Sequence, residues 1–286
     1  RFNKIIIFGV GLIGGSFALA LRKAKAVQEV VGFGRSTATL EQARKLGIID
    51  RTGKDMAAEI STADLVLLAT PVGQMAELMA AIAPHLGKHT LITDGGSTKS
   101  NVVRDAYAQL GSKVAQFVPA HPIAGAEQSG PAAARADLYV DKKVVLTPLP
   151  ENTAAAVTRV QAAWQACGAH IHKLTHSEHD AVFAAVSHLP HLLSFALVND
   201  LAQRDNRDVL LTFAASGFRD FTRIAASSPE MWRDICLSNR DALLKELQTY
   251  IAELTRMSAA IAVEDTEYLE QTFRSAQQLR AGWSEK

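Results

Sequence analysis

The chain of 286 residues has few cysteines, no excess of charge of either sign and no obvious membrane-spanning run. Cys167 and Cys236 are too few for a disulfide framework. Thirty Lys and Arg against 29 Asp and Glu leave a net charge of +1, which gives no electrostatic case for nucleic acid or an anionic membrane. We expect no apolar run of the ~20 residues needed to cross a bilayer, and no signal peptide. These absences favour a cytoplasmic protein that binds neither nucleic acid nor membrane.

The composition that remains is globular, with 48% hydrophobic and 21% charged residues. Up to about residue 174, short β-branched runs alternate with helical patterns. Strands are predicted at residues 4–9, 30–33, 65–69, 91–93, 117–118 and 144–147, with helices at 12–22 and 36–46 among those between them. This alternation is typical of βαβ units and a mostly parallel sheet, here a Rossmann-type α/β domain over residues 1–174.

The second part, residues 175–286, is predicted to be all helical. Helices are expected at residues 176–202, kinked at Pro190, and at 241–262 and 264–279. Leu247, Ile251, Leu254 and Ile261 form an apolar stripe that is either an internal core face or a dimer seam. A cleft between the two parts is the expected place for a small-molecule site.

A glycine motif follows the first predicted strand and opens the first helix. Residues 9–14 are G-x-G-x-x-G, with Gly9 for the tight turn, Gly11 for approach of a pyrophosphate and Gly14 for close packing of helix and strand. The free N–H groups of the helix would face the phosphates. Residues 1–174 are therefore predicted to bind a dinucleotide.

The end of the second strand indicates which dinucleotide. No carboxylate lies between Val30 and Leu40 to bind a ribose 2′-hydroxyl, whereas Arg35, Ser36 and Thr37 suit a 2′-phosphate. We expect NADP to be preferred, with NAD possible. The alternative is that Arg35 is a solvated charge and Ser36 only a helix cap. The expected cofactor contacts are Gly9, Gly11, Leu12, Ile13, Gly14, Arg35, Ser36, Thr37, Thr70, Pro71 and Gly96.

Polar residues that a core would not select lie beyond two later strands and within the long helix. Residues 94–99 (DGGSTK) offer hydroxyls that are either site groups or helix caps. His121, fixed by the following proline, is a candidate proton acceptor at the ligand end of the sheet. His188 and His191 share a helix face, and His176 and His179 form a second such pair. Zinc is a weaker interpretation, because no further ligands complete a site, and we predict no metal.

Two arginines in an apolar, aromatic segment indicate an anionic substrate. Arg219 and Arg223 lie in residues 217–225 (GFRDFTRIA), and a guanidinium binds a carboxylate through two hydrogen bonds. Exposed surface arginines are the alternative. Trp232, just beyond, is expected in the core or as a wall of the site.

Six segments in this order resemble the prephenate/arogenate dehydrogenase family of tyrosine biosynthesis. They are GVGLIGGS (9–16), DGGSTK (94–99), HPIAGAEQSG (121–130), SHLPH (187–191), GFRDFTRIA (217–225) and MWRDI (231–235). The resemblance spans nearly the whole chain, and its last four motifs are the more specific ones. It implies a helical C-terminal domain that dimerises, which favours the seam interpretation of the apolar stripe.

The resemblance also implies a reaction and roles for individual residues. A cyclohexadienyl ring loses hydride to the nicotinamide and CO2 from its carboxylate, so that prephenate or arogenate becomes 4-hydroxyphenylpyruvate or tyrosine. His121 would accept the proton of the ring hydroxyl, and Ser97 would orient both groups. Arg223 and His191 would bind substrate. A supporting or gating shell would comprise Glu127, Asp180, His188 and Trp232, with Arg219 near a dimer interface.

Two departures from the family pattern bear on specificity. Gly34 replaces the acid of NAD-using relatives, which supports NADP, and Ala126 replaces a frequent Thr, which leaves the side-chain end of the substrate open. Two other functions remain as alternatives: a β-hydroxy-acid dehydrogenase of similar architecture, and a non-catalytic NADP-binding dimer.

Overall fold

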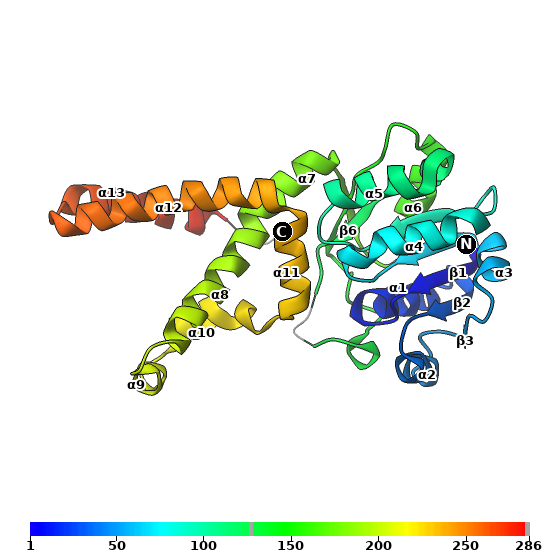
Figure 1. The fold of residues 1–286 in the computed structure, drawn as a ribbon, viewed down its shortest axis with the longest axis horizontal. Coiled ribbons are helices and arrows are strands. Elements are labelled where there is room, and N and C mark those ends of the chain that lie inside the picture. Colours follow the sequence, from blue (N-terminus) through cyan, green and yellow to red (C-terminus); the bar gives the residue numbers. More distant parts are fainter. Residues whose placement is uncertain (126–127, 284–286) are drawn as a thin grey trace. The chain divides into compact units, whose positions relative to one another are not determined.

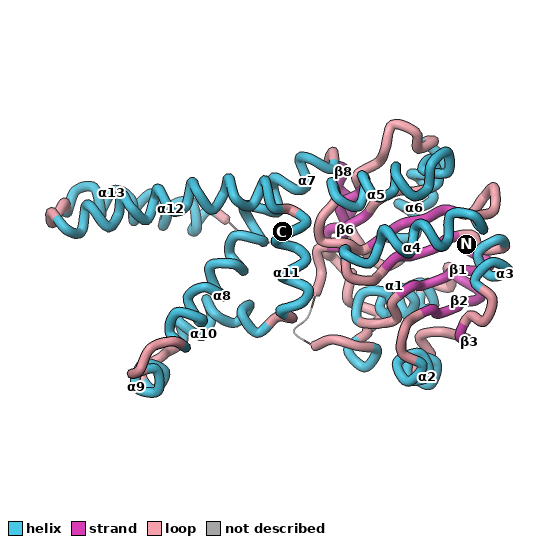
Figure 2. The backbone as a smooth tube through the Cα atoms, in the orientation of Figure 1, coloured by secondary structure: helices cyan, strands magenta, loops and turns pink. Residues whose placement is uncertain are grey.

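A computed structural model describes residues 1–125 and 128–283. By its internal contacts the chain divides into two compact units, Arg1–Arg240 and Asp241–Lys286. The first unit contains a parallel sheet with strand order β3-β2-β1-β4-β5 and a smaller sheet with order β6-β7-β8 (Figure 2). The strands of the first sheet are β1 (Phe2–Phe8), β2 (Val27–Phe33), β3 (Arg51–Thr52), β4 (Leu65–Leu68) and β5 (Leu91–Asp94).

Helices cover both faces of the parallel sheet because its strands are apolar on both faces. Ile5 and Ile7 of β1 join one core cluster, with α1, α2 and α6, while Ile6 and Phe8 join another, with α3, α4 and α5 (Figure 1). These helices are α1 (Leu12–Lys23), α2 (Thr37–Lys45), α3 (Met56–Ser61), α4 (Met75–Ile82), α5 (Ser100–Leu110) and α6 (Ala154–Ala166). Short 3-10 turns lie at Val72–Gln74, Ala83–His85, Gly111–Gln116 and Pro131–Ala133.

The second sheet carries the chain from the nucleotide-binding fold to the helical region. Its strands are β6 (Ala120–Pro122), β7 (Lys143–Leu146) and β8 (His170–Lys173), with β6 and β7 antiparallel and β7 and β8 parallel. A strand was predicted at residues 117–118. It was placed too early, since Phe117 forms only an isolated bridge with Ile92 and the strand begins at Ala120. The strand β8 was missed because its alternation of polar His and Lys residues leaves little apolar signal.

The helical region begins at α7, and the helix predicted over residues 176–202 is confirmed as a continuous one. It consists of α7 (His176–Phe183), a π-helical turn (Ala184–His188) and α8 (Leu189–Ala202), with Pro190 in the first turn of α8, directly after the π-helical turn. The remaining elements are α9 (Arg207–Thr212), α10 (Ser216–Thr222), the 3-10 turn Arg223–Ala226, α11 (Pro229–Ser238), α12 (Arg240–Ala262) and α13 (Thr266–Gly282). The predicted Rossmann-type domain and helical C-terminal region are thus confirmed.

One apolar stretch is longer than the sequence led us to expect. Residues His176–Ala202 are long and apolar enough, by length and composition alone, to cross a membrane. This corrects the expectation that no apolar run reaches the ~20 residues needed to cross a bilayer. Core helices of soluble proteins pass the same test. Here Asp180 and His188, within this stretch, hydrogen-bond to other parts of the first unit, which indicates a helix that faces protein on this side.

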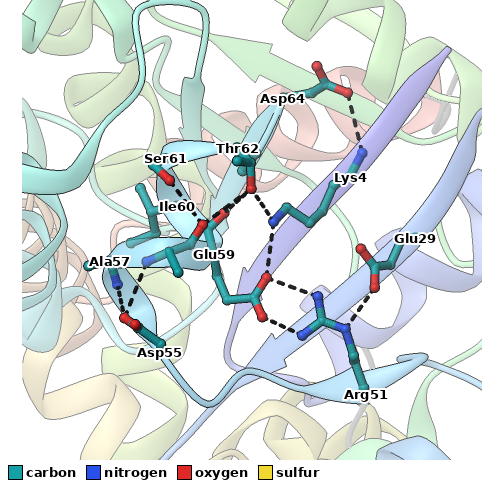
Figure 3. Close-up of polar contacts among 12 residues, drawn as sticks. Lys4, Glu29, Arg51, Asp55, Ala57, Glu59, Ile60, Ser61, Thr62 and Asp64 are labelled. Carbon is teal, nitrogen blue, oxygen red and sulfur yellow. Dashed lines mark hydrogen bonds and ion pairs between the residues drawn. The ribbon is translucent and has the colours of Figure 1, made fainter.

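The strand ends opposite the glycine motif are joined by a network of ion pairs. Glu59 of α3 pairs with Arg51 of β3 and with Lys4 of β1 at 3.0 Å, and Arg51 also binds Glu29 of β2 at 2.7 Å (Figure 3). The hydrogen bond from Arg51 lowers the pKa of Glu59 to about 2 and outweighs the effect of burial, which raises this pKa. The network joins β1, β2, β3 and α3 at the end of the sheet that lies away from the glycine turn.

The second unit comprises α12 from Asp241 onward and α13. Ile251, Leu254 and Ile261 of the predicted apolar stripe are 48–62% exposed there. Within the described residues of a single chain, therefore, the stripe does not form an internal core face.

Candidate active site

The glycine turn between β1 and α1 has the geometry that its motif predicts. Gly9 has a φ of +91°, and a Cβ on it would lie 2.4 Å from the carbonyl oxygen of Ala69. A Cβ on Gly14 would lie 2.1 Å from the carbonyl oxygen of Gly9. Gly11 caps α1 without a side-chain hydrogen bond, so the first N–H groups of this helix receive no side-chain cap. An anion can therefore bind at the start of α1.

A cavity of about 620 Å³ opens beside this turn. It is lined by six of the predicted cofactor residues, namely Gly9, Gly11, Arg35, Ser36, Thr70 and Pro71. Other predicted contacts, all described in the structure, do not line it: Leu12, Ile13, Gly14, Thr37 and Gly96. Leu12 and Ile13 instead pack against the core. The Thr70 hydroxyl is buried without a hydrogen-bond partner, as a group that awaits a polar ligand would be.

These residues fit a dinucleotide, and the cavity is lined by charged side chains of both signs. Arg35 lines the cavity, and so does the exposed carboxylate of Glu77 on α4. The Ser36 hydroxyl accepts a hydrogen bond from the Thr39 N–H at 3.2 Å and caps α2, as the alternative interpretation of this residue expected. A Cβ on Gly34 would meet only Leu40, at 3.6 Å or more, so this position has room for a side chain.

A buried ion pair beyond β5 holds the loop that carries Ser97. The Asp94 carboxylate pairs with the Lys99 ammonium, and both side chains are fully buried. Asp94 also accepts hydrogen bonds at 2.9 Å from the N–H groups of Gly96 and of Ala120, the first residue of β6. Because one carboxylate contacts both segments, the partly buried Ser97 and the neighbouring strand that carries His121 are fixed to each other. The sequence motif contained both ion-pair residues but gave no sign of their pairing.

His121 is the first member of a row of hydrogen-bonded side chains. Its Nδ1 lies 2.8 Å from Nε2 of His179, and Nδ1 of His179 lies 2.8 Å from Oδ1 of Asp180. The Phe183 ring packs against both imidazoles, at 4.9 and 4.5 Å between ring centres. Burial lowers the pKa of His121 well below its usual value, with further lowering by the charges of His179, Lys99 and His188. His121 is therefore neutral near pH 7 and can accept a proton.

Asp180, which the resemblance placed in a supporting or gating shell, is committed to protein groups. Its carboxylate accepts hydrogen bonds from the N–H groups of Lys99 (2.8 Å) and Ser100 (2.7 Å), at the start of α5. Burial raises its pKa, but the hydrogen bonds from His179, Ser100 and Lys99 outweigh burial and bring the value to about 2. Asp180 is thus an ionised support rather than a group that faces substrate.

His188 is likewise buried and occupied on both sides. Its Nδ1 lies 3.1 Å from the amide nitrogen of Asn239, which also donates to the Asp180 carbonyl at 2.8 Å. The backbone of Ser97 bonds to the same imidazole. Burial lowers the pKa of His188 to about 4. His188 therefore supports the Ser97 loop from behind, and the sequence gave no signal for Asn239.

A second group of predicted residues gathers around Trp232. The His191 ring stacks on Trp232 with 3.7 Å between ring centres, and its Nδ1 donates to the Ser187 carbonyl at 2.8 Å. Burial lowers the pKa of His191, and the charge of Arg223 lowers it further, which places Arg223 near this imidazole. The indole N–H of Trp232 is buried without a protein acceptor.

Two residues predicted to bind substrate remain, Arg219 and Glu127. Arg219 is exposed, 3.7 Å from Asp220 on its own helix. Glu127 lies outside the described residues. Among the residues that the structure describes, no group of three or more His, Cys, Asp or Glu side chains could hold a metal ion.

The buried neutral histidines predict a loss of stability at acid pH. The unfolded chain takes up protons on His121, His179 and His188 near pH 6.5, whereas in the folded protein their lowered pKa values keep them neutral. Their contribution is therefore complete above pH 6.5 and is lost as the pH falls toward 4. Each histidine should contribute a slope of up to about 1.4 kcal/mol per pH unit.

Urea unfolding in steps between about pH 7.5 and pH 4.5 measures this slope. His188→Gln should reduce it, whereas the same change at the exposed His89 should leave it as in the wild type. A wild-type free energy of unfolding that does not fall over this range would contradict the assignment of neutral, buried imidazoles.

Comparison with known proteins identifies the family. Residues 17–173 match the family model "prephenate dehydrogenase, nucleotide-binding domain", and residues 175–275 match "prephenate dehydrogenase, dimerization domain". A cyclohexadienyl dehydrogenase of Zymomonas mobilis is 37% identical over 281 residues, covering 98% of this chain and 95% of that protein. A prephenate dehydrogenase of Bacillus subtilis is 38% identical over 282 residues, covering 98% and 76%.

Solved structures give the same result. The crystal structure of prephenate dehydrogenase from Aquifex aeolicus with hydroxyphenyl propionate and NAD+ superposes with a TM-score of 0.91 at 34% identity, over 98% of each chain. A Synechocystis arogenate dehydrogenase gives a TM-score of 0.82 at 29% identity, over 98% of this chain and all of that one. The resemblance found in the sequence is confirmed, and the chain belongs to the prephenate dehydrogenase family of nicotinamide-dependent oxidoreductases.

Proposed function

We propose that this enzyme catalyses the oxidative decarboxylation of prephenate or arogenate, with NADP preferred over NAD and His121 as the proton acceptor. One observation carries the proposal: His121 of β6 is partly buried, its Nδ1 is hydrogen-bonded to His179 at 2.8 Å, and burial holds its pKa well below its usual value. Gly95 lies between the start of α1 and the strand that carries His121. A Cβ on Gly95 would be 2.9 Å from the Ile13 side chain of α1 and 3.9 Å from Pro122, the residue after His121. The names of the relatives supply the substrate class.

The proposed reaction requires a base that acts and is then regenerated. The ring carbon that carries the hydroxyl gives its hydride to the nicotinamide, which the cofactor supplies as acceptor. His121 takes the hydroxyl proton, so that positive charge does not build up on that carbon. The C–C bond to the ring carboxylate then breaks, CO2 leaves, and the electron pair enters the ring. The phenolate oxygen takes the proton back from His121, and the ring is aromatic.

The remaining predicted residues would position the substrate. Ser97 would orient the hydroxyl, and the contacts of its loop with Asp94 and His188 support this role. The Arg223 guanidinium can bind a carboxylate. The indole N–H of Trp232, which has no protein acceptor, offers a further hydrogen-bond donor beside His191. Glu127 remains proposed from the resemblance alone. With ring and nicotinamide held in place, aromatisation drives the reaction.

The cofactor preference and the assembly are finer parts of the same proposal. Arg35 and the missing acid at Gly34 support NADP, while the carboxylate of Glu77, which also lines the cavity, opposes the binding of a 2′-phosphate. We also infer a homodimer through the helical part, in the cytoplasm. The exposed stripe of Ile251, Leu254 and Ile261 and the match to a dimerization domain support the dimer.

Initial rates with prephenate and arogenate, each with NADP and with NAD, test the activity. We expect turnover of at least one substrate, faster with NADP. His121→Asn should lower kcat by roughly 10²–10⁴-fold, as loss of a general base does. His89→Asn, at an exposed site, serves as the matched control. Folded protein that binds NADP but turns over none of the four pairs would overturn the proposed activity, and would favour a β-hydroxy-acid dehydrogenase or a non-catalytic dimer.

Gly34→Asp tests the cofactor assignment separately. The side chain has room, and its carboxylate would bind the ribose 2′-hydroxyl of NAD and repel a 2′-phosphate. A charged hydrogen bond of about 1.5–3 kcal/mol should raise kcat/KM for NAD relative to NADP by roughly 10–100-fold. Arg35→Gln should weaken NADP alone, and Arg44→Gln, a change outside the cavity, should affect neither cofactor. An unchanged ratio in both the Gly34 and the Arg35 variants would contradict this account of the 2′ position.

A further inference from the structure

The side chains behind His121 form a directional row. Asp180 lies at its far end, where its carboxylate already accepts two backbone N–H groups of α5. His179 lies between, with a fully buried side chain. Nδ1 of His179 is 2.8 Å from the carboxylate and Nε2 is 2.8 Å from Nδ1 of His121. Both nitrogens of the middle imidazole are therefore in use, and neither is available to substrate.

The chemistry of the acceptor fixes the protons along this row. An ionised carboxylate can only accept hydrogen bonds, so Nδ1 of His179 must carry its proton. A neutral imidazole has one N–H, so Nε2 of His179 must be the bare acceptor. Nδ1 of His121 must then be the donor. The bare nitrogen of His121 is Nε2, on the side of the ring away from His179.

We propose that His179, set by Asp180, is a positioning residue that keeps His121 in the single tautomer whose Nε2 is unprotonated and able to accept the hydroxyl proton. The same contact fixes the orientation of the His121 ring, with the Phe183 ring packed against both imidazoles. This proposal rests on the proposed function, since it assigns a role to His179 in the reaction of His121.

The row also serves the protonated state of the base. When His121 takes the proton, its Nδ1–H donates to the bare Nε2 of His179, and the Asp180 carboxylate lies one imidazole further away. Two other titratable groups act on His121: Lys99, which is paired with Asp94, and His188, which is neutral near pH 7. The ionised carboxylate at the end of the row therefore favours the transient imidazolium, while burial keeps the resting imidazole neutral.

A purely structural role of His179 would require only that its contact with Asp180 be kept, and this can be separated from the contact with His121. His179→Asn places an amide donor where Nδ1 was, near Asp180, but is too short to reach His121. His179→Gln is one methylene longer, and its amide can donate to Asp180 while its oxygen accepts from His121. His179→Leu removes both contacts and keeps the volume similar.

Steady-state kinetics on the wild type and these variants tests the proposal, together with thermal unfolding and NADP binding as measures of fold. We expect kcat to fall by roughly 100-fold in the Leu and the Asn variants, at the lower end of what a general base contributes, with KM little changed. The Gln variant should recover kcat to within a few-fold of wild type. Equal kcat values for Asn and Gln, or wild-type kcat in the Leu variant, would overturn the proposal.

Imidazole ¹⁵N shifts give a second measurement that does not depend on turnover. With ¹⁵N-labelled histidine and His121→Asn for assignment, His121 should show a protonated Nδ1 and a bare Nε2 in the wild type and the Gln variant. The Leu and Asn variants should show a mixture of tautomers. If the wild type turns over neither substrate, the proposed function fails but these shifts still decide the tautomer. A wild-type His121 protonated on Nε2 would overturn the proposal even if the enzyme is active.

Discussion

The Asp180 carboxylate is the point on which the rest of the site depends. It accepts the first N–H groups of α5 and thereby holds the end of the loop that carries Ser97. It sets the direction of the hydrogen bonds through His179 to His121, and its own carbonyl receives Asn239, which in turn holds His188. One buried, ionised side chain of α7 thus joins the parallel sheet to the helices that carry His191 and Trp232. Its removal would leave several buried donors without partners, which is costly inside a protein.

Asp94, the last residue of the parallel strand β5, is a second buried carboxylate that holds segments of the site together. Its pairing with Lys99 neutralises both groups, and its second oxygen reaches the start of β6. Burying ions is favourable only when they are paired and their remaining hydrogen bonds are satisfied, and both conditions hold here. Ser97 lies in the loop after β5 and His121 lies in β6, and these two carboxylates fix the position of the one backbone relative to the other.

How much of this could be predicted from sequence depends on how local each signal is. The glycine turn was predictable because its three glycines act within a few residues of one another, and His121 because it is followed by a proline and stands close to a predicted strand, although it lies within β6 rather than after a strand. His191, Arg223 and Trp232 stood out as polar or aromatic residues in apolar segments, and the family resemblance gave them roles in substrate binding or in the shell around it. His179, however, was noted only as half of a possible metal pair, since its partner His121 lies 58 residues earlier in the chain. Asn239 is polar and unremarkable in sequence, and acquires a role only when folding brings it to His188, 51 residues away. The π-helical turn and the strand β8 also depend on tertiary packing rather than on local pattern.

The central claim is that catalysis depends on a His121 that is neutral because it is buried. The pH dependence of kcat/KM tests this most directly, because it reports the pKa of essential groups in the free enzyme. Since burial lowers the pKa of His121, kcat/KM should stay constant as the pH falls from about 8 through 6.5, and decline only below that value, with circular dichroism used to show that the protein is still folded. The residual activity of His121→Asn should lack this decline. A wild-type midpoint at or above pH 6.5, or the same decline in the variant, would contradict the account.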